Sequence, residues 1–268
     1  MTLEPLSGDL RAFAEDPGAF VVIGPDEERI LTDRYSVTFT PGVHFWSASV
    51  QRLRFGVGDV AAGVAEIRDL VADRGRTAAA WTVGPSATPE GLLELLVAMG
   101  MKSESESDEG SLILILTEPP HVKAPPFEVR LVASYADHEA AIEVANQGFA
   151  FPGEDALDER RRAHAGFQSE QAGGHSVRLL AVDRGRPVAA GRAWFSPLGL
   201  YLGGGATIPS ERRRGAMGAL VARAWELAVD RGTPTLVTFA GAMAATGLQR
   251  MGFRAVGRVW HLVDRIDG

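Results

Sequence analysis

The sequence predicts an α+β protein made of two similar halves, and three observations indicate this. Alternating patterns typical of strands and 3.6-residue patterns typical of helices follow one another along the chain. A segment with four prolines, 117–128, separates two stretches in which these elements come in the same order. In both stretches the long helix ends on Asp-Arg-Gly and the short helix ends on Met-Gly. We therefore expect an internal repeat.

The first half is expected to hold three strands and two helices before the proline-rich segment. The long helix ends at Asp73–Gly75 and the short one at Met99–Gly100, where glycine can supply the left-handed residue that terminates a helix. The expected elements are strand 44–55, helix 59–75, strand 76–84, helix 88–100 and strand 111–117.

The second half repeats this order and adds a longer front portion. Its two helices also end on glycine, at Asp230–Gly232 and Met251–Gly252. The expected front elements are strand 127–134, helix 136–149, helix 154–171, strand 177–184 and strand 187–196. The expected repeated elements are strand 199–208, helix 212–232, strand 234–240, helix 242–252 and strand 255–263.

Composition and charge narrow the class of protein. The net charge of −7 is uneven, with −9 in residues 1–125 and +2 in residues 126–268. We expect no nucleic-acid binding, and we expect an anionic ligand to favour the second half. The start of the chain lacks a signal-peptide pattern, and the longest aliphatic run, Leu112–Leu116, cannot span a bilayer. We therefore expect a cytoplasmic protein with no membrane partner.

One glycine-rich motif resembles a nucleotide-binding site but is better explained as a turn. Gly56, Gly58 and Ala61 imitate a dinucleotide-binding fingerprint, but Asp59 would project into the phosphate site. The next strand, 76–84, also ends without the acidic residue that would hold a ribose. A turn between a strand and a helix is the better interpretation, and a nucleotide-dependent oxidoreductase is a distant alternative.

Metal and cysteine chemistry are not expected. The chain has no cysteine, and its six histidines are scattered without the spacing of metal ligands. The charged run 154–162 has i to i+4 spacing, which is typical of a solvated helix face and only occasionally of a catalytic carboxylate pair.

The stretch 203–228 carries the chemical signal. Three glycines, 203–205, interrupt a strand, and three arginines, 212–214, precede a helix, where the helix dipole disfavours positive charge. Glycines and bare N–H groups at this helix start would suit a phosphate or pyrophosphate. The alternative is a surface helix whose arginines are solvated, with Ser210 and Glu211 capping it.

This stretch resembles the acyl-CoA loop of the GCN5-related N-acetyltransferase (GNAT) superfamily, R-x-x-G-x-G/A after a strand. Arg212 and Gly215 fill the first two fixed positions, while Met217 stands at the third and Gly218 follows it. The next strand and helix end on Gly252–Phe253, as in the family. The resemblance implies two GNAT-like domains in tandem, each a mixed, mostly antiparallel curved sheet flanked by helices. Residues 1–124 would form a degenerate domain and residues 125–268 the acetyl-CoA-binding domain.

The resemblance further implies an N-acetyltransferase that moves an acetyl group from acetyl-CoA directly to a primary amine of a small molecule. The pantetheine arm would pair with the backbone of Ala206, Thr207 and Ile208, where two strands splay apart. The pyrophosphate would bind the loop residues Arg212, Arg213, Arg214, Gly215, Ala216, Met217 and Gly218. The first half lacks this loop and is not expected to bind CoA. A non-catalytic CoA-binding protein is the alternative.

The catalytic residues depart from the family pattern. The tyrosine that often acts as general acid is replaced by Leu248, and the asparagine at the head of the same helix is replaced by Gly241. Tyr201, on the predicted fourth strand, is our candidate acid. The base stays open among Glu154, Asp155 and His175.

The acceptor pocket is expected over residues 148–175. Aromatic and acidic side chains gather there and would suit a cationic, partly apolar amine; the candidates are Phe149, Phe151, Glu154 and Asp155. Two copies in one chain can pack as an internal pseudo-dimer, so both a monomer and a homodimer are compatible with the sequence.

Overall fold

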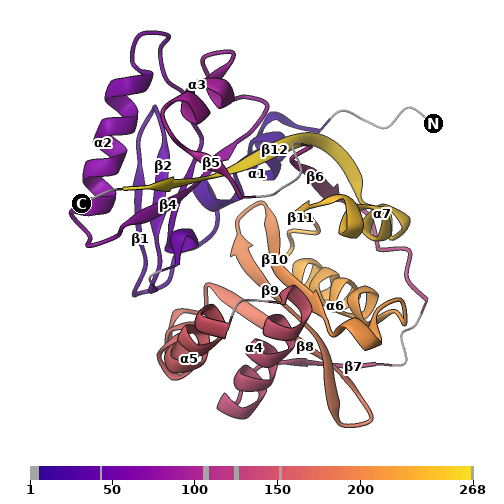
Figure 1. Ribbon diagram of the computed structural model, residues 1–268. Helices are drawn as coiled ribbons and strands as arrows, with labels where there is room; N and C mark the ends of the chain where they lie inside the picture. The colour runs from indigo at the N-terminus through magenta and orange to yellow at the C-terminus, as the bar shows by residue number, and fades with distance from the viewer. Residues whose placement is uncertain (1–5, 43, 105–108, 124–126, 151–152, 267–268) are drawn as a thin grey trace.

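A sheet of twelve strands runs through the part of the chain that the structure describes. This computed structural model describes residues 6–42, 44–104, 109–123, 127–150 and 153–266, with the backbone alone at 153–159 and 161–162. The strand order is β1-β2-β3-β4-β12-β6-β11-β10-β9-β8-β7, and β5 pairs with β12 (Figure 1). Within these ranges no helix is both long and apolar enough to cross a membrane.

The first half follows the expected order of elements, preceded by a helix and a hairpin that periodicity did not predict. Its one parallel pair is β3 with β4, and its other pairs are antiparallel. Its helices and strands are α1 (Gly8–Glu15), β1 (Glu28–Leu31), β2 (Ser36–Phe39), β3 (Ala48–Gln51), α2 (Val60–Ala72), β4 (Ala78–Val83), α3 (Leu92–Ala98), β5 (Lys102–Ser103) and β6 (Ser111–Leu116).

The second half contains every predicted element. Its one parallel pair is β10 with β11. Its helices and strands are β7 (Glu128–Leu131), α4 (Tyr135–Phe149), α5 (Gly153–Gly173), β8 (Ser176–Asp183), β9 (Arg186–Ser196), β10 (Gly199–Thr207), α6 (Ala216–Asp230), β11 (Leu236–Ala240), α7 (Ala242–Arg250) and β12 (Arg254–Arg265). The prediction of a mixed, mostly antiparallel α+β fold is confirmed.

Two strands cross between the halves. The first-half strand β6 lies between β11 and β12, and the last part of β12, from Trp260 to Arg265, pairs with β4 of the first half (Figure 1). Arg68 of α2 fixes this end of β12 through two hydrogen bonds to the buried Asp264 carboxylate, at 2.8 and 2.9 Å. The division at residue 124 stays a prediction, because the sheet is continuous across it. The oligomeric state also stays a prediction.

Helices pack on both faces of the second half. The apolar stripe of α6 is buried, with Leu220, Val221, Ala224 and Ala228 less than 5% exposed. On β10, a Cβ at Gly205 would meet Met217 of α6, whereas the Cβ of the next residue, Ala206, faces Gly148 of α4. Because neighbouring strand residues point to opposite faces, α6 and α4 cover opposite sides of β10.

Candidate active site

The parallel strands β10 and β11 separate where the sequence places its three glycines. They are paired only from Leu200 to Leu202, opposite Leu236 to Thr238, after which β10 continues to Thr207 alongside β9 alone. A bulge follows Gly203, and Gly204 takes a φ of +60°, a conformation that glycine adopts without strain. Beyond Leu202, one edge of β10 therefore has no strand partner among the described residues.

The directions of the backbone N–H groups show which of the predicted residues Ala206, Thr207 and Ile208 faces the open edge of β10. The N–H of Ile208 donates to the carbonyl of Val188 at 3.0 Å and thus points to β9. Because hydrogen-bonded pairs alternate along antiparallel strands, Ala206 also faces β9, and Thr207 faces the open edge. Of the three predicted residues, Thr207 is the one whose N–H points to the open edge of β10.

The start of α6 provides a concentration of free N–H groups. The helix begins at Ala216 after Gly215, which takes a φ of +96°, and Arg213 also has a positive φ of +63°. The N–H groups of the four residues from Gly215 to Gly218 donate to no other residue that the structure describes. Together with the helix dipole, these N–H groups could hold an anion.

The three arginines before α6 have different environments. Arg212 donates to the carbonyl of Gly148 at 2.8 Å and to that of Thr207 at 3.3 Å. Arg214 pairs with Asp183 at 2.9 Å and with Glu211, and these bonds raise its pKa. Arg213 is exposed and makes no hydrogen bond or ion pair within the described ranges. Arg212 and Arg214 hold the loop, and Arg213 is free to meet an anion.

Two residues inside the motif pack closely on their surroundings. A Cβ on Gly205 would lie 3.3 Å from the Met217 methyl carbon, so Met217 covers the β10 bulge on the α6 side. A Cβ on Gly218 would lie 3.3 Å from Val122, in the proline-rich linker that passes across the first turn of α6. Glycine at 218 therefore leaves room for the linker.

Tyr201 lies on β10 before the opening. Its ring stacks on Trp194 at 5.5 Å and lies 5.8 Å from Phe239. The hydroxyl makes no hydrogen bond to a described residue, and burial, with the nearby Glu104 charge, raises the Tyr201 pKa to about 12. The phenol therefore stays protonated at neutral pH. By contrast, Leu248 packs against the core beside α6 and offers no proton.

The candidate bases are placed differently. His175 is 1% exposed, with Nε2 3.3 Å from Arg192 Nη2 and 3.5 Å from Glu27 Oε1. The ring is enclosed by its neighbours, and a role for His175 as the base stays a prediction. Glu154 and Asp155 lie in the first turn of α5, but their side chains fall outside the described residues.

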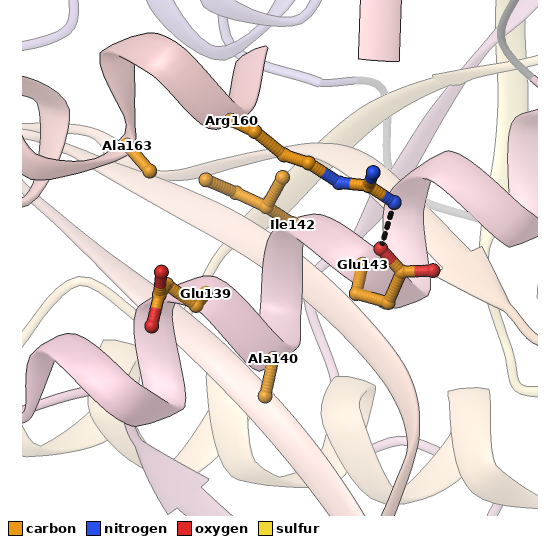
Figure 2. Close-up of a pocket in the computed structure, with 6 residues that line it drawn as sticks. All are labelled: Glu139, Ala140, Ile142, Glu143, Arg160 and Ala163. Carbon is orange, nitrogen blue, oxygen red and sulfur yellow. Dashed lines mark hydrogen bonds and ion pairs between the residues drawn. The ribbon is translucent and has the colours of Figure 1, made fainter. Parts of the chain in front are cut away.

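The predicted acceptor residues are only partly described. Phe149 ends α4 and is 46% exposed, whereas Phe151 falls outside the described residues. Figure 2 shows a nearby depression between α4 and α5, across which Arg160 reaches Glu143 at 2.6 Å. Its lining residues are Glu139, Ala140, Ile142, Glu143, Arg160 and Ala163. Two carboxylates line this depression, Glu139 and Glu143, and the one at Glu143 is already paired with Arg160.

No metal site accompanies these residues. Within the described ranges, no group of three or more histidine or carboxylate side chains could hold a metal ion.

Comparisons with known proteins identify the fold. No protein-family model and no curated protein sequence matches the chain. A GCN5-related N-acetyltransferase structure from Kribbella flavida aligns with a TM-score of 0.69 at 20% identity, covering 97% of this chain and 96% of that one. A tandem GNAT protein from the clavulanic acid biosynthesis pathway aligns with a TM-score of 0.56 at 17% identity, covering 92% and 86%. A GCN5-related N-acetyltransferase from Sphaerobacter thermophilus aligns with a TM-score of 0.55 at 16% identity, covering 89% and 82%. The resemblance drawn from the loop motif is confirmed at the level of the fold.

Proposed function

We propose that this chain, which has the fold of tandem GCN5-related N-acetyltransferases, transfers acetyl from acetyl-CoA to a primary amine of a small molecule. The observation that carries the proposal is the junction in the second half. There the open edge of β10 leads to the four free N–H groups at the start of α6. A linear ligand with amide groups and a pyrophosphate matches both features.

The residues available for acetyl-CoA follow from this junction. We assign the pyrophosphate to the N–H groups from Gly215 to Gly218, with the exposed Arg213 beside them. The Thr207 N–H would pair with the pantetheine arm. Arg212 and Arg214 hold the loop in place by donating hydrogen bonds to the Gly148 carbonyl and the Asp183 carboxylate.

The chemistry needs an unprotonated amine, a polarised thioester carbonyl and a leaving thiolate. Acetyl-CoA supplies the activated acetyl group when bound. The amine nitrogen forms a bond to the carbonyl carbon and releases one proton to solvent water, the carbon–sulfur bond breaks, and the thiolate takes up a proton. Tyr201 is the proposed donor of that proton, since its phenol stays protonated at neutral pH.

A second candidate function is CoA binding without transfer. The specific observation in its favour is Leu248, which packs against the core at the position of the usual acid.

The test combines a binding and a turnover measurement. Calorimetry should detect acetyl-CoA binding, and a thiol-release assay with a panel of primary amines should detect transfer. Tyr201→Phe keeps the ring stack and should lower kcat at least about 100-fold with unchanged affinity for acetyl-CoA. Binding without thiol release from any amine would favour the second candidate, and absence of binding would exclude both. An unchanged kcat in Tyr201→Phe would remove Tyr201 from the mechanism.

A further inference from the structure

A row of five aromatic rings crosses from the second half to the first. Trp194, Tyr201 and Phe239 come from β9, β10 and β11, His261 comes from β12, and Trp46 comes from the short helix Phe45–Ser47. Neighbouring ring centroids are 5.2 to 5.8 Å apart. Each of the five residues is partly exposed, although Trp194, Tyr201 and Phe239 also pack against the core beside α1.

This aromatic row begins at the β10–β11 opening. A Cβ on Gly203, where the strands start to separate, would lie 2.9 Å from the Trp194 ring and 3.8 Å from Tyr201. These two rings therefore cover the residue at which the reactive end of an acyl donor would arrive. From there Phe239, His261 and Trp46 extend the row into the first half.

The row carries little charge. Arg192 stacks over Trp194 at 4.6 Å, but its guanidinium also lies 3.5 Å from the Glu170 carboxylate. Burial lowers the pKa of His261 to about 4, so its ring is neutral. The Glu104 carboxylate accepts a hydrogen bond from Trp46 Nε1 at 2.9 Å, and its charge also acts on Tyr201. One carboxylate is a poor match for a polyamine, whereas flat partly exposed rings favour an aromatic body.

We propose that this aromatic row is the acceptor subsite, and that the acceptor is a primary amine carrying an aromatic ring. The inference rests on the proposed function. The amine lies at Tyr201 and Phe239 beside the opening, and the aromatic body lies along His261 and Trp46. Stacking and edge contacts hold the ring, and the protonated amine gains from the π-faces before it loses its proton. The first half, which lacks the acyl-CoA loop, thus supplies part of the acceptor site.

The test compares phenethylamine and tryptamine with hexylamine and spermidine. In calorimetry with the CoA-bound protein, the aromatic amines should bind at least about tenfold more tightly than the aliphatic ones. Trp46→Ala should weaken their binding about tenfold and leave acetyl-CoA affinity unchanged. Trp46→Phe, which keeps a ring, should restore most of the affinity.

The control variant is Val57→Ala, at an exposed first-half residue away from the row, and it should change nothing. Equal binding of aromatic and aliphatic amines, or unchanged aromatic-amine binding in Trp46→Ala, would overturn the inference. Aromatic amines that bind through Trp46 without any thiol release would uphold the subsite and contradict the proposed transferase function.

Discussion

In each half a pair of parallel strands separates, but only the gap in the second half is left unfilled. In the second half, β10 leaves β11 after a bulge at Gly204, and its free edge has no strand partner in the described part of the chain. In the first half, β3 is paired with β4 only as far as Val50, and Arg52, just beyond β3, takes a similar φ of +56°. There the chain closes the gap itself, because Thr88 donates to the Leu53 carbonyl and accepts from the Phe55 N–H, both at 3.1 Å.

Carboxylates fill the rest of the first-half opening. Asp16 accepts a hydrogen bond from the Arg52 N–H at 2.9 Å and lies 3.2 Å from Arg54. Asp59 precedes α2, and its carboxylate lies so close to Gly56 that a Cβ there would be 2.5 Å from it. A pyrophosphate at this helix start would meet negative charge. The difference teaches that the backbone opening alone does not make a ligand site; the surrounding residues must leave it unfilled.

The largest expected effect comes from placing a carboxylate at the start of α6. Met217→Glu puts negative charge in the first turn, where it stabilises the helix by roughly 0.3 to 1 kcal/mol but repels a pyrophosphate. Calorimetry should show CoA affinity reduced by about 100-fold or more, and thermal stability should fall modestly because the Met217 side chain packs against the core.

The control is Ala61→Glu, at the second residue of α2 in the first half, which is exposed. It should leave CoA affinity unchanged. If Met217→Glu binds CoA as the unmodified chain does, the pyrophosphate does not lie at α6.

The sequence predicted more of the second half than of the first. The strand, loop and helix around Gly215 are local patterns, so they were predictable, although α6 begins four residues later than expected because Gly215 is left-handed. Roles within the loop were not predictable, since Arg212 and Arg214 find partners on α4 and at Asp183. The aromatic row was missed for the same reason. Its members come from five separate elements that only the tertiary fold brings together.

Strand β12 of the second half pairs with β4 and β6 of the first half. The Arg68–Asp264 pair that anchors it should therefore stabilise both halves. Asp264 is buried, while Arg68 is about one-third exposed and can reach solvent once its partner is lost. Asp264→Ala should therefore lower the free energy of unfolding by about 2 kcal/mol, less than for a fully buried pair. Arg130→Ala, which breaks an exposed pair with Glu128, should change it by less than about 1 kcal/mol.

Calorimetric scans should show one transition for both variants, because hydrogen bonds of β6 and β12 connect the halves. Two separate transitions in Asp264→Ala would mean that the halves unfold independently, and the comparison would then be between two domains rather than two ends of one sheet.

The last expected effect depends on pH and concerns Asp16, a carboxylate that closes the first-half opening. Burial raises the pKa of Asp16 from 3.8 to about 6, although the Arg52 N–H and Arg54 oppose the rise. A group with a raised pKa contributes stability that is complete below about pH 4 and is lost as the pH rises through about 6. Asp16→Asn cannot titrate, so its stability relative to the unmodified chain should increase across that window. The full change is at most about 3 kcal/mol, a figure that already includes the opposing Arg52 N–H and Arg54 interactions. Urea unfolding of both proteins at pH 4, 5, 6 and 7.5 measures this difference. If the difference does not vary with pH, Asp16 is not held in a desolvated site, and the first-half opening is less tightly closed than its hydrogen bonds indicate.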